Sequence, residues 1–512
     1  MPTPPAAPPN SDHSRELARG GIASFLGAII SALAGFALTV VLARMLGGSG
    51  SGVVLQAIAI FTIVLSFARS GMDSSAIWIM PRLASADVKQ IRSALGVMFL
   101  TTVIVGILLG AATVLVAPVF GLSGDSDASQ LSQAISAIGW FLPVGALLLV
   151  ALSATRGLGG VWPYVSVGSI ALPASRPLIV AVIAGLAGSL VLVSVGWVLP
   201  LPFALIAALI VLRFQVRRHE RATGERGHWR ATPALRRSIW SYAFPRMVSA
   251  GLEQSVLWLD VLIVGIVGGS AAAGIYGGAS RFIAAGLIVD TSIRVVISPR
   301  FSSLLGQKRI PEVAALYRTA ATWLVLFSTP IYVILALFGP VALGWLGPEF
   351  TQGSTALAIL CVGAVLTFTA GNIHSVLLMS GRSGWGAFNK AIVLVINIVG
   401  NLLLIPVIGI VGAALTWALS MLVDAALAAI EVKKFVGIGI GFRAISYALL
   451  VPVATVGVPS VILVVTIGPT LASMLFAIGI GGVLLVAWCA LDRERLQLQD
   501  LSLFARQVRP PE

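Results

Sequence analysis

Long apolar stretches recur along the whole chain, and they constrain its fold more than any other feature of the sequence. Between residues 20 and 491, apolar runs alternate with short polar segments. A run of roughly 20 apolar residues is long enough to cross the hydrocarbon core of a bilayer as a helix. Because 58% of the 512 residues are hydrophobic and only 10% are charged, a soluble fold could not bury this much apolar surface. The sequence therefore predicts an all-α polytopic membrane protein.

The apolar segments predict about fourteen transmembrane helices, each of roughly 18 residues or more. The first six lie near residues 20–46, 53–80, 93–120, 131–153, 161–186 and 190–212. The others lie near 239–267, 273–297, 319–345, 355–379, 386–406, 409–431, 445–467 and 470–491. Several are longer than one crossing needs, which allows for tilt or for extension beyond the lipid.

Two stretches of the first half resemble stretches of the second half, which indicates an internal repeat. LGGSGSGVVLQA (46–57) resembles VGGSAAAGIYGGA (267–279), and GLAGSL (185–190) resembles GIVGAA (409–414). Repeats with an even number of spans keep the same orientation and are related by an axis along the membrane normal. We therefore expect two six-helix lobes followed by two further spans. The expected segments are a disordered cytoplasmic tail (1–19), an N-lobe (20–213), a basic cytoplasmic linker (214–238), a C-lobe (239–432), the last two spans (433–492) and a cytoplasmic tail (493–512).

The basic residues gather in the loops on one side of the predicted helices, and they account for the net charge of +14. They crowd loops 82–92, 213–237 and 300–318 and both chain ends. By the positive-inside rule, both termini and the central loop are cytoplasmic, in a bacterial plasma (inner) membrane. This distribution argues against a nucleic-acid partner. An ordinary linker is the favoured interpretation of the basic run 213–237, and contact with anionic lipid headgroups stays an alternative.

Charged residues inside the predicted spans are the main candidates for function, because a charge at bilayer depth costs about 3 kcal/mol on insertion scales. The seventh span holds Arg246, Glu253 and Asp260, spaced by nearly two helical turns, so that we expect all three on one stripe facing a water-filled cavity. Arg281 in the eighth span lies about as far beyond the connecting turn as Asp260 lies before it. We therefore expect Asp260 and Arg281 to form an ion pair.

Two further pairs and one single arginine complete the main set of candidates for a central substrate-binding cavity. Asp290 with Arg294, and Arg69 with Asp73, are spaced to meet on one helix face. For these two pairs, a structural staple between packed helices and a binding role remain open. Arg176 lies between two prolines of the fifth span without a local acidic partner, where a broken helix could expose backbone groups.

Polar residues in the later spans are weaker candidates. Intramembrane asparagines more often hold helices together than bind a ligand. A single histidine near the inner end of a span is more often structural than a proton carrier. These weaker candidates are Asn372, His374, Asn397, Asn401 and Asp424.

The sequence lacks the motifs of the common enzyme classes. It has no GxxxxGK[ST] phosphate-binding loop, no HExxH and no Cys/His cluster, and its two cysteines lie in apolar segments. The DxD of GDSD (124–127) lies in a short loop that brings no other candidate metal ligand, so that a solvated turn is the favoured interpretation. We expect no catalytic residue, no cofactor and no bound metal. Coupling to the membrane potential, Na⁺ or H⁺ stays open.

Four segments resemble polysaccharide and lipid-linked oligosaccharide flippases of the multidrug/oligosaccharidyl-lipid/polysaccharide (MOP) superfamily. They are LARMLGGSGSG, FARSGMDSS, DVLIVGIVGGSAAAGIYGGASRF and NLLLIPVIGIVGAALTWALS, and the resemblance covers about residues 20–435. It implies two six-helix lobes arranged as a V, alternating access and, in some branches, two extra C-terminal helices. The superfamily includes Wzx-type repeat-unit flippases, lipid II flippases and MATE drug exporters.

Individual residues relate the chain to particular branches. The Y-x(3–4)-R pattern of lipid II flippases matches Tyr276 and Arg281, whereas Ser31 and Ala37 stand nearest to that branch's first-span arginines. MATE exporters use an acid in the first span, and no Asp or Glu occurs here between residues 16 and 73. The resemblance implies a flippase that moves a polyprenyl-diphosphate-linked oligosaccharide from the inner to the outer leaflet. Its partners would be that lipid-linked glycan, membrane lipids and other polysaccharide-synthesis membrane proteins.

Two other functions stay open. One is a MATE-like exporter of cationic drugs, in which the intramembrane carboxylates would hold the drug. The other is a membrane scaffold of a polysaccharide-synthesis complex that transports nothing.

Overall fold

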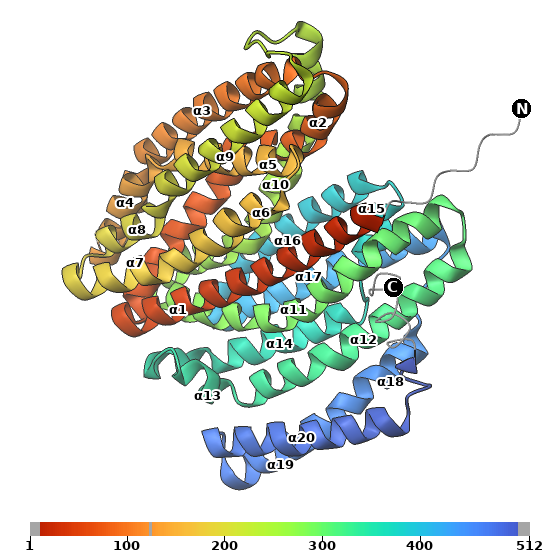
Figure 1. The fold of residues 1–512 in the computed structure, drawn as a ribbon. Coiled ribbons are helices and arrows are strands. Elements are labelled where there is room, and N and C mark those ends of the chain that lie inside the picture. The colour runs from red at the N-terminus through yellow and green to blue at the C-terminus, as the bar shows by residue number, and fades with distance from the viewer. Residues whose placement is uncertain (1–10, 122–124, 500–512) are drawn as a thin grey trace, which may run out of the picture.

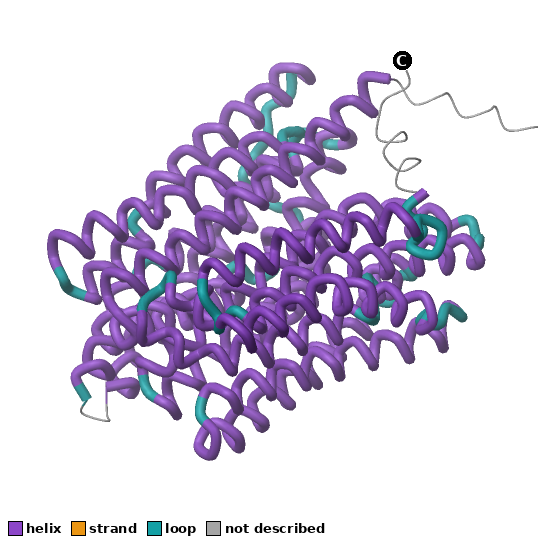
Figure 2. Tube along the Cα trace, turned by 90° about the horizontal axis from the view of Figure 1, so that it is seen from below, coloured by secondary structure: helices purple, strands orange, loops and turns teal. Residues whose placement is uncertain are grey.

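The computed structural model describes residues 11–121 and 125–499, and within these ranges it contains helices and loops but no strand (Figure 2). The first half contains α1 (Ser11–Ala68), α2 (Met72–Ala86), α3 (Gln90–Val116), η1 (Ala117–Gly121), α4 (Ser126–Gly139), α5 (Leu142–Gly157), α6 (Val161–Pro163), η2 (Tyr164–Ala171), α7 (Leu172–Ala187), α8 (Leu190–Val198) and α9 (Pro200–Thr223). The second half begins with α10 (Pro233–Gly268), α11 (Ser270–Gly306), α12 (Ile310–Leu337), α13 (Gly339–Gly344), η3 (Pro348–Gly353), α14 (Ser354–Phe368), α15 (Ile373–Met379), α16 (Ser383–Ile408) and α17 (Ile410–Val436). The last elements are α18 (Phe442–Pro452), η4 (Val453–Gly457), α19 (Val458–Ile467) and α20 (Leu471–Leu491).

The predicted all-α membrane fold is confirmed, and the number of candidate crossings agrees approximately with the expected fourteen. Twelve described helices are long and apolar enough to cross a membrane, or up to thirteen if α4 and α5, which meet at 49°, form one span. The apolar part of α1 alone has 46 residues, which at ~1.5 Å per residue makes it about twice as long as the hydrocarbon core is thick. α1 is in fact two helices joined at Gly47, whose φ of 68° and ψ of −172° suit glycine alone. Figure 1 shows the two arms of α1 on either side of this kink.

The two segments with matching sequences pack against each other, which joins the two halves of the chain. A Cβ atom on Gly52 would lie 1.7 Å from the carbonyl oxygen of Ser270, and one on Gly274 would lie 2.0 Å from that of Gly48. Only glycine allows the backbones to approach this closely, as in other small-residue contacts between membrane helices. Gln56 adds a hydrogen bond from its amide nitrogen to the Ser270 hydroxyl at 3.4 Å.

The remaining helices are arranged around this junction (Figure 1). α1 packs against α4 and α7 of the first half and against α10 and α11 of the second half. α18, η4, α19 and α20 pack along α12, so that the last two spans lie on the outside of the second group of helices, where we expected residues 445–491 (Figure 1). Leu496, which follows α20, is fully buried against Val451 and Leu326.

Three expected boundaries differ from the structure. Residues 11–19 belong to α1, although we expected them to be disordered. The other tail residues, 1–10 and 500–512, lie outside the described residues, and so does Gly124 of the GDSD segment. The loop between α9 and α10 is residues 224–232 alone, shorter than the expected linker 214–238. α9 continues to Thr223 because arginines are good helix formers, and it ends at Gly224 in a left-handed conformation. Residues 493–496 turn back onto the helices and do not begin a free tail.

Candidate functional site

Arg281 is held by an aromatic ring and not by the expected carboxylate. Its guanidinium carbon lies 4.2 Å from the centroid of the Trp258 ring on α10. Arg281 is half-buried, and among the described residues it has no ion-pair or hydrogen-bond partner. The next residue, Phe282, packs edge-on against Phe36 of α1 at 5.2 Å. Arg281 is therefore a cation beside the contact between α11 and the first arm of α1.

Asp260 lies in a separate buried cluster, so that the expected ion pair with Arg281 is wrong for this conformation. The carboxylate accepts hydrogen bonds from the Tyr276 hydroxyl at 3.3 Å and from the Asn401 amide at 2.9 Å. Asn401 also donates to the side-chain oxygen of Asn397 at 3.0 Å. Trp258 and Asp260 are two residues apart on α10, which is about 200° of rotation around the helix axis. Their side chains therefore point to nearly opposite sides of the helix. Because Arg281 lies over Trp258, it is on the wrong side of α10 to reach Asp260.

The three residues expected on one stripe of α10, Arg246, Glu253 and Asp260, have different surroundings. Asp260 is only 4% exposed, whereas Arg246 and Glu253 are exposed and have no ion-pair partner among the described residues. A spacing of seven residues drifts by about 20° per repeat around a straight helix. The three side chains are thus aligned only loosely, and the structure buries the last of them alone.

Arg176 resembles Arg281 in its surroundings. Its guanidinium carbon lies 4.0 Å from the Trp197 ring centroid, and its Nε donates to the Trp197 carbonyl oxygen at 3.1 Å. Trp197 in turn packs edge-on against Phe61 of α1. The expected break at the prolines lies one turn earlier, where η2 forms a π-helix that leads into α7. Arg176 therefore lies among the helices of the first half of the chain, stacked on an aromatic ring, and no carboxylate of the described residues pairs with it.

The predicted pair of Arg69 and Asp73 forms, at 2.9 Å, across the break between α1 and α2. Ser70 and Gly71 in this break have positive φ values of 52° and 68°. A Cβ on Gly71 would lie 2.1 Å from the carbonyl oxygen of Ala243 on α10. The pair thus ties together the two ends of a break that is pressed against α10, which is the geometry of a staple.

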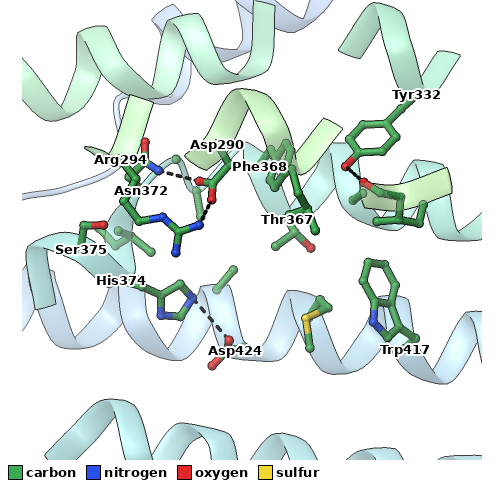
Figure 3. A pocket seen from close by; sticks show the side chains of 18 of the residues that line it. Asp290, Arg294, Tyr332, Thr367, Phe368, Asn372, His374, Ser375, Trp417 and Asp424 are labelled. Atoms are coloured by element: carbon green, nitrogen blue, oxygen red, sulfur yellow. Dashed lines mark hydrogen bonds and ion pairs between the residues drawn. The ribbon is translucent and has the colours of Figure 1, made fainter. Parts of the chain in front are cut away.

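The second predicted pair lines a cavity of about 200 Å³ within the second half of the chain (Figure 3). Arg294 donates to Asp290, one turn away on α11. The other oxygen of Asp290 accepts from the Asn372 amide at 2.6 Å. Asn372 precedes α15, so that the carboxylate joins α11 to the helix break between α14 and α15. The predicted pair Asp290–Arg294 is therefore confirmed, and Asn372 is its third member.

A second carboxylate lies across the same cavity (Figure 3). Asp424 on α17 is 4% exposed and accepts from Lys390 at 2.5 Å, while His374 Nε2 lies 3.4 Å away. Sequence reasoning missed Lys390, which lies within the predicted span 386–406 and which α16 carries into the cavity. The signal that could have found it is Asp424 itself, because a buried carboxylate needs a cationic partner.

Two oxygen atoms of this cavity have no partner. Asn372 Oδ1 and Asp424 Oδ1 are both buried and make no hydrogen bond within the described residues. Lys390 and Arg294 neutralise the two carboxylates. The two unpaired oxygen atoms therefore lack hydrogen-bond donors and not a counter-charge. Water satisfies such groups in a polar cavity of this size.

Two family models match the chain. The model described as polysaccharide biosynthesis protein matches residues 17–305. The model described as MatE matches residues 245–403.

Two curated proteins of Haloferax volcanii are similar to part of the chain. The probable low-salt glycan biosynthesis flippase Agl15 is 27% identical over 223 residues, which are 43% of this chain and 47% of that protein. The probable flippase AglR is 26% identical over 204 residues, 39% of this chain and 42% of that protein. The match thus spans less than half the length of either relative.

Solved structures share the fold over most of the chain. An inward closed conformation of the lipid II flippase MurJ is 15% identical, with a TM-score of 0.69 over 92% of this chain and 98% of that one. An inward-facing multidrug resistance transporter of the MATE family is 12% identical, with a TM-score of 0.62 over 80% of this chain and 95% of that one. At such identities these likenesses show a shared helical fold and nothing finer.

Proposed function

Because the chain belongs to the polysaccharide biosynthesis protein family, whose model matches residues 17–305, we propose that it is a flippase for a lipid-linked glycan. In this proposal it moves a polyprenyl-diphosphate-linked oligosaccharide from the inner to the outer leaflet by alternating access. The protein would act without catalytic chemistry, by binding the charged headgroup while the lipid tail stays in the membrane. The naming of both Haloferax volcanii relatives as probable flippases supports the proposal.

The observation that carries the substrate class is the position of Arg281. Its guanidinium stacks on Trp258, the residue is half-buried, and no carboxylate among the described residues neutralises it. A planar guanidinium donates pairs of hydrogen bonds that match phosphate oxygens. The ring holds the side chain in place and leaves its N–H edge free, whereas a carboxylate partner would occupy that edge. Arg281 is therefore suited to bind a diphosphate.

Arg176 has a related geometry on the other half of the chain. It too stacks on a tryptophan, but one of its donors already bonds the Trp197 carbonyl. Its remaining donors are available for an anion that passes the first helical group. We assign Arg176 as the second phosphate-binding arginine, with a smaller contribution than Arg281.

Asp260 is the residue that we propose for ion coupling. It is a buried carboxylate bonded to Tyr276 and Asn401, and it has no cationic side chain as partner among the described residues. A buried and uncompensated carboxylate favours the binding of a proton or a small cation. The side-chain oxygen of Asn401, whose amide nitrogen bonds Asp260, is buried without a hydrogen-bond partner among the described residues, and an oxygen ligand of this kind suits Na⁺ as well as water.

The same carboxylate favours a second candidate function, a MATE-like exporter of cationic drugs. The MatE model matches residues 245–403, a range that contains both Asp260 and Arg281. In such an exporter the acid would hold the drug, and Arg281 would be an obstacle to it. The two candidates therefore differ in which sign of charge the substrate site requires.

Transport by charge-neutralising variants separates the two candidates. We expect Arg281→Gln and Arg176→Gln to lose transport of a fluorescent polyprenyl-diphosphate disaccharide in proteoliposomes, measured by a membrane-impermeant quencher. Each charge-assisted phosphate contact contributes about 1.5–3 kcal/mol, or roughly one to two powers of ten. The matched variants Glu253→Gln and Asp73→Asn should keep at least part of the activity. Asp260 is left out because its loss would impair both candidates, through ion coupling in a flippase and through drug binding in an exporter.

The opposite ranking would overturn the flippase proposal. If the carboxylate variants lose transport and the arginine variants keep it, the substrate is a cation. Efflux of a cationic dye by the wild-type protein, measured in the same vesicles, would point in the same direction. A protein that moves neither probe would act as a scaffold.

A further inference from the structure

A pocket outside the candidate site lies where α3 begins, α9 ends and the loop 224–232 closes over both. It has a volume of about 400 Å³. Its floor is apolar and includes Phe99 of α3 and Leu209 and Leu212 of α9, and its rim carries three arginines and Trp229. A pocket that is apolar at the base and cationic at the rim suits a ligand with an apolar chain and a negative head.

Two of the three rim arginines have no partner. Arg92 is committed to Glu220 through two hydrogen bonds of 2.6 and 2.7 Å. Arg213 and Arg217 lie one turn apart on α9, are exposed, and form no ion pair or hydrogen bond with the described residues. The pocket therefore presents two uncompensated positive charges on one side.

The pocket lies where the exposed apolar face of α9 ends and its arginines begin. Exposed apolar residues follow one face of α9 at helical spacing, namely Phe203, Ile206, Ile210 and Phe214. This lipid-facing stripe ends at Phe214, beside the two free arginines. Trp229 is 62% exposed at the same rim, as expected for an aromatic side chain at a membrane interface. Long arginine side chains at such a level reach toward lipid headgroups.

The loop that completes the rim is fixed to the helices beneath it. The Ser93 hydroxyl donates to the His228 carbonyl at 2.5 Å, and the Gly227 N–H donates to Glu220 at 3.0 Å. Lys89 pairs with Glu225 at 2.8 Å. Trp229 is thus a fixed wall of the pocket. The loop also connects α9 to α10, which is the link between the two halves of the chain.

We propose that this pocket binds one anionic phospholipid of the phosphatidylglycerol type from the surrounding leaflet. Arg213 and Arg217 hold the phosphate diester, Trp229 covers the glycerol region, and one acyl chain lies over Leu212 and Phe99. A soluble phosphate would not use the apolar floor, and nucleic acid would need more than two free cations. The bound lipid fastens the loop 224–232 to the first half of the chain.

Lipid titration of the purified full chain tests the proposal. We expect native mass spectrometry to show one palmitoyl-oleoyl phosphatidylglycerol bound in preference to the phosphatidylcholine analogue, with a matching rise in the unfolding temperature. Arg213→Gln with Arg217→Gln should weaken this binding by about thirtyfold, because each basic residue near an anionic membrane surface contributes about 1 kcal/mol and the pair contributes about 2 kcal/mol. The control pair Arg236→Gln with Arg237→Gln removes the same charge from exposed positions at the start of α10 and should leave binding unchanged.

A space-filling variant distinguishes the lipid from a free anion. Leu209→Trp fills the apolar floor and should abolish the preference for phosphatidylglycerol, while inorganic phosphate should stabilise neither this variant nor the wild type. The unfolding temperature in phosphatidylcholine shows that each variant is folded. Equal binding of both lipids by the wild type would overturn the proposal. So would an equal loss of binding in the Arg236/Arg237 control, because the attraction would then come from the general surface charge.

Discussion

Two arginines on the same helix, α11, have opposite surroundings. Arg281 stacks on the Trp258 ring and contacts no carboxylate among the described residues. Arg294, nearer the end of α11, donates to Asp290, which is also bonded by Asn372. One guanidinium lies on an aromatic ring, and the other is paired with a carboxylate.

The difference shows that a charge inside a membrane span is a candidate for ligand binding only when the protein leaves it uncompensated. Around the cavity of Figure 3, each carboxylate has a cationic side chain beside it, Arg294 for Asp290 and Lys390 for Asp424. Their charges cancel, and their bonds join α11, α15, α16 and α17. We therefore propose that this second region is a structural network and that the binding role belongs to Arg281.

The largest effect on stability should come from Asp424. We expect Asp424→Asn to destabilise the protein by about 3 kcal/mol, because it leaves the Lys390 ammonium without its buried partner. A lower midpoint of thermal unfolding in detergent would show this. The exposed pair Lys89–Glu225 gives the control, since Glu225→Gln should cost less than about 1 kcal/mol.

A double variant checks the reason for that loss. Asp424→Leu combined with Lys390→Met removes both charges and should recover most of the stability, since paired buried charges are often replaced by apolar residues without loss. If Asp424→Asn unfolds at the wild-type temperature, the network does not hold the helices together and the contrast between the two regions fails.

A smaller effect, on transport, should follow from the loss of the Trp258 ring. Trp258→Leu removes the stacking partner of Arg281, and a partly buried cation–π contact contributes about 1–2 kcal/mol. Initial transport rates should therefore fall by about tenfold. Trp240→Leu removes an exposed tryptophan from the same helix and should have no effect. Equal rates for both variants would mean that the ring does not position Arg281.

The smallest effect should come from Arg294. Asp290 keeps its hydrogen bond from Asn372 at 2.6 Å when Arg294 is changed to Gln, so that transport should fall by no more than about threefold, or roughly 0.6 kcal/mol. The double variant with Asp290→Asn should transport no worse than the single one. A loss as large as that of Arg281→Gln would show that both arginines bind the substrate.

Sequence reasoning predicted the fold well because each apolar run is long enough to specify its own helix. It also found the pairs Asp290–Arg294 and Arg69–Asp73, since residues four apart meet on one turn, or across a short break, regardless of the tertiary fold. These local contacts depend mainly on the spacing of the two residues along the chain.

The contacts between helices were harder to predict. Depth along the membrane suggested that Asp260 and Arg281 meet, but depth says nothing about the rotation of each helix about its own axis. Asp260 instead bonds Asn401, which is 141 residues away in the chain. Lys390 was missed because a single lysine near the end of an apolar run more often marks the boundary of a span than the partner of a buried carboxylate. These features required the packed structure.

The central claim, that Arg281 binds the diphosphate, is tested most directly by the affinity of the purified protein for a fluorescent polyprenyl-diphosphate disaccharide. Wild-type protein, Arg281→Gln and Arg294→Gln would be compared in detergent micelles with the same probe. We expect Arg281→Gln to bind about 10- to 100-fold more weakly, and Arg294→Gln to stay within about threefold of the wild type. Equal affinities of the wild type and Arg281→Gln would contradict the claim.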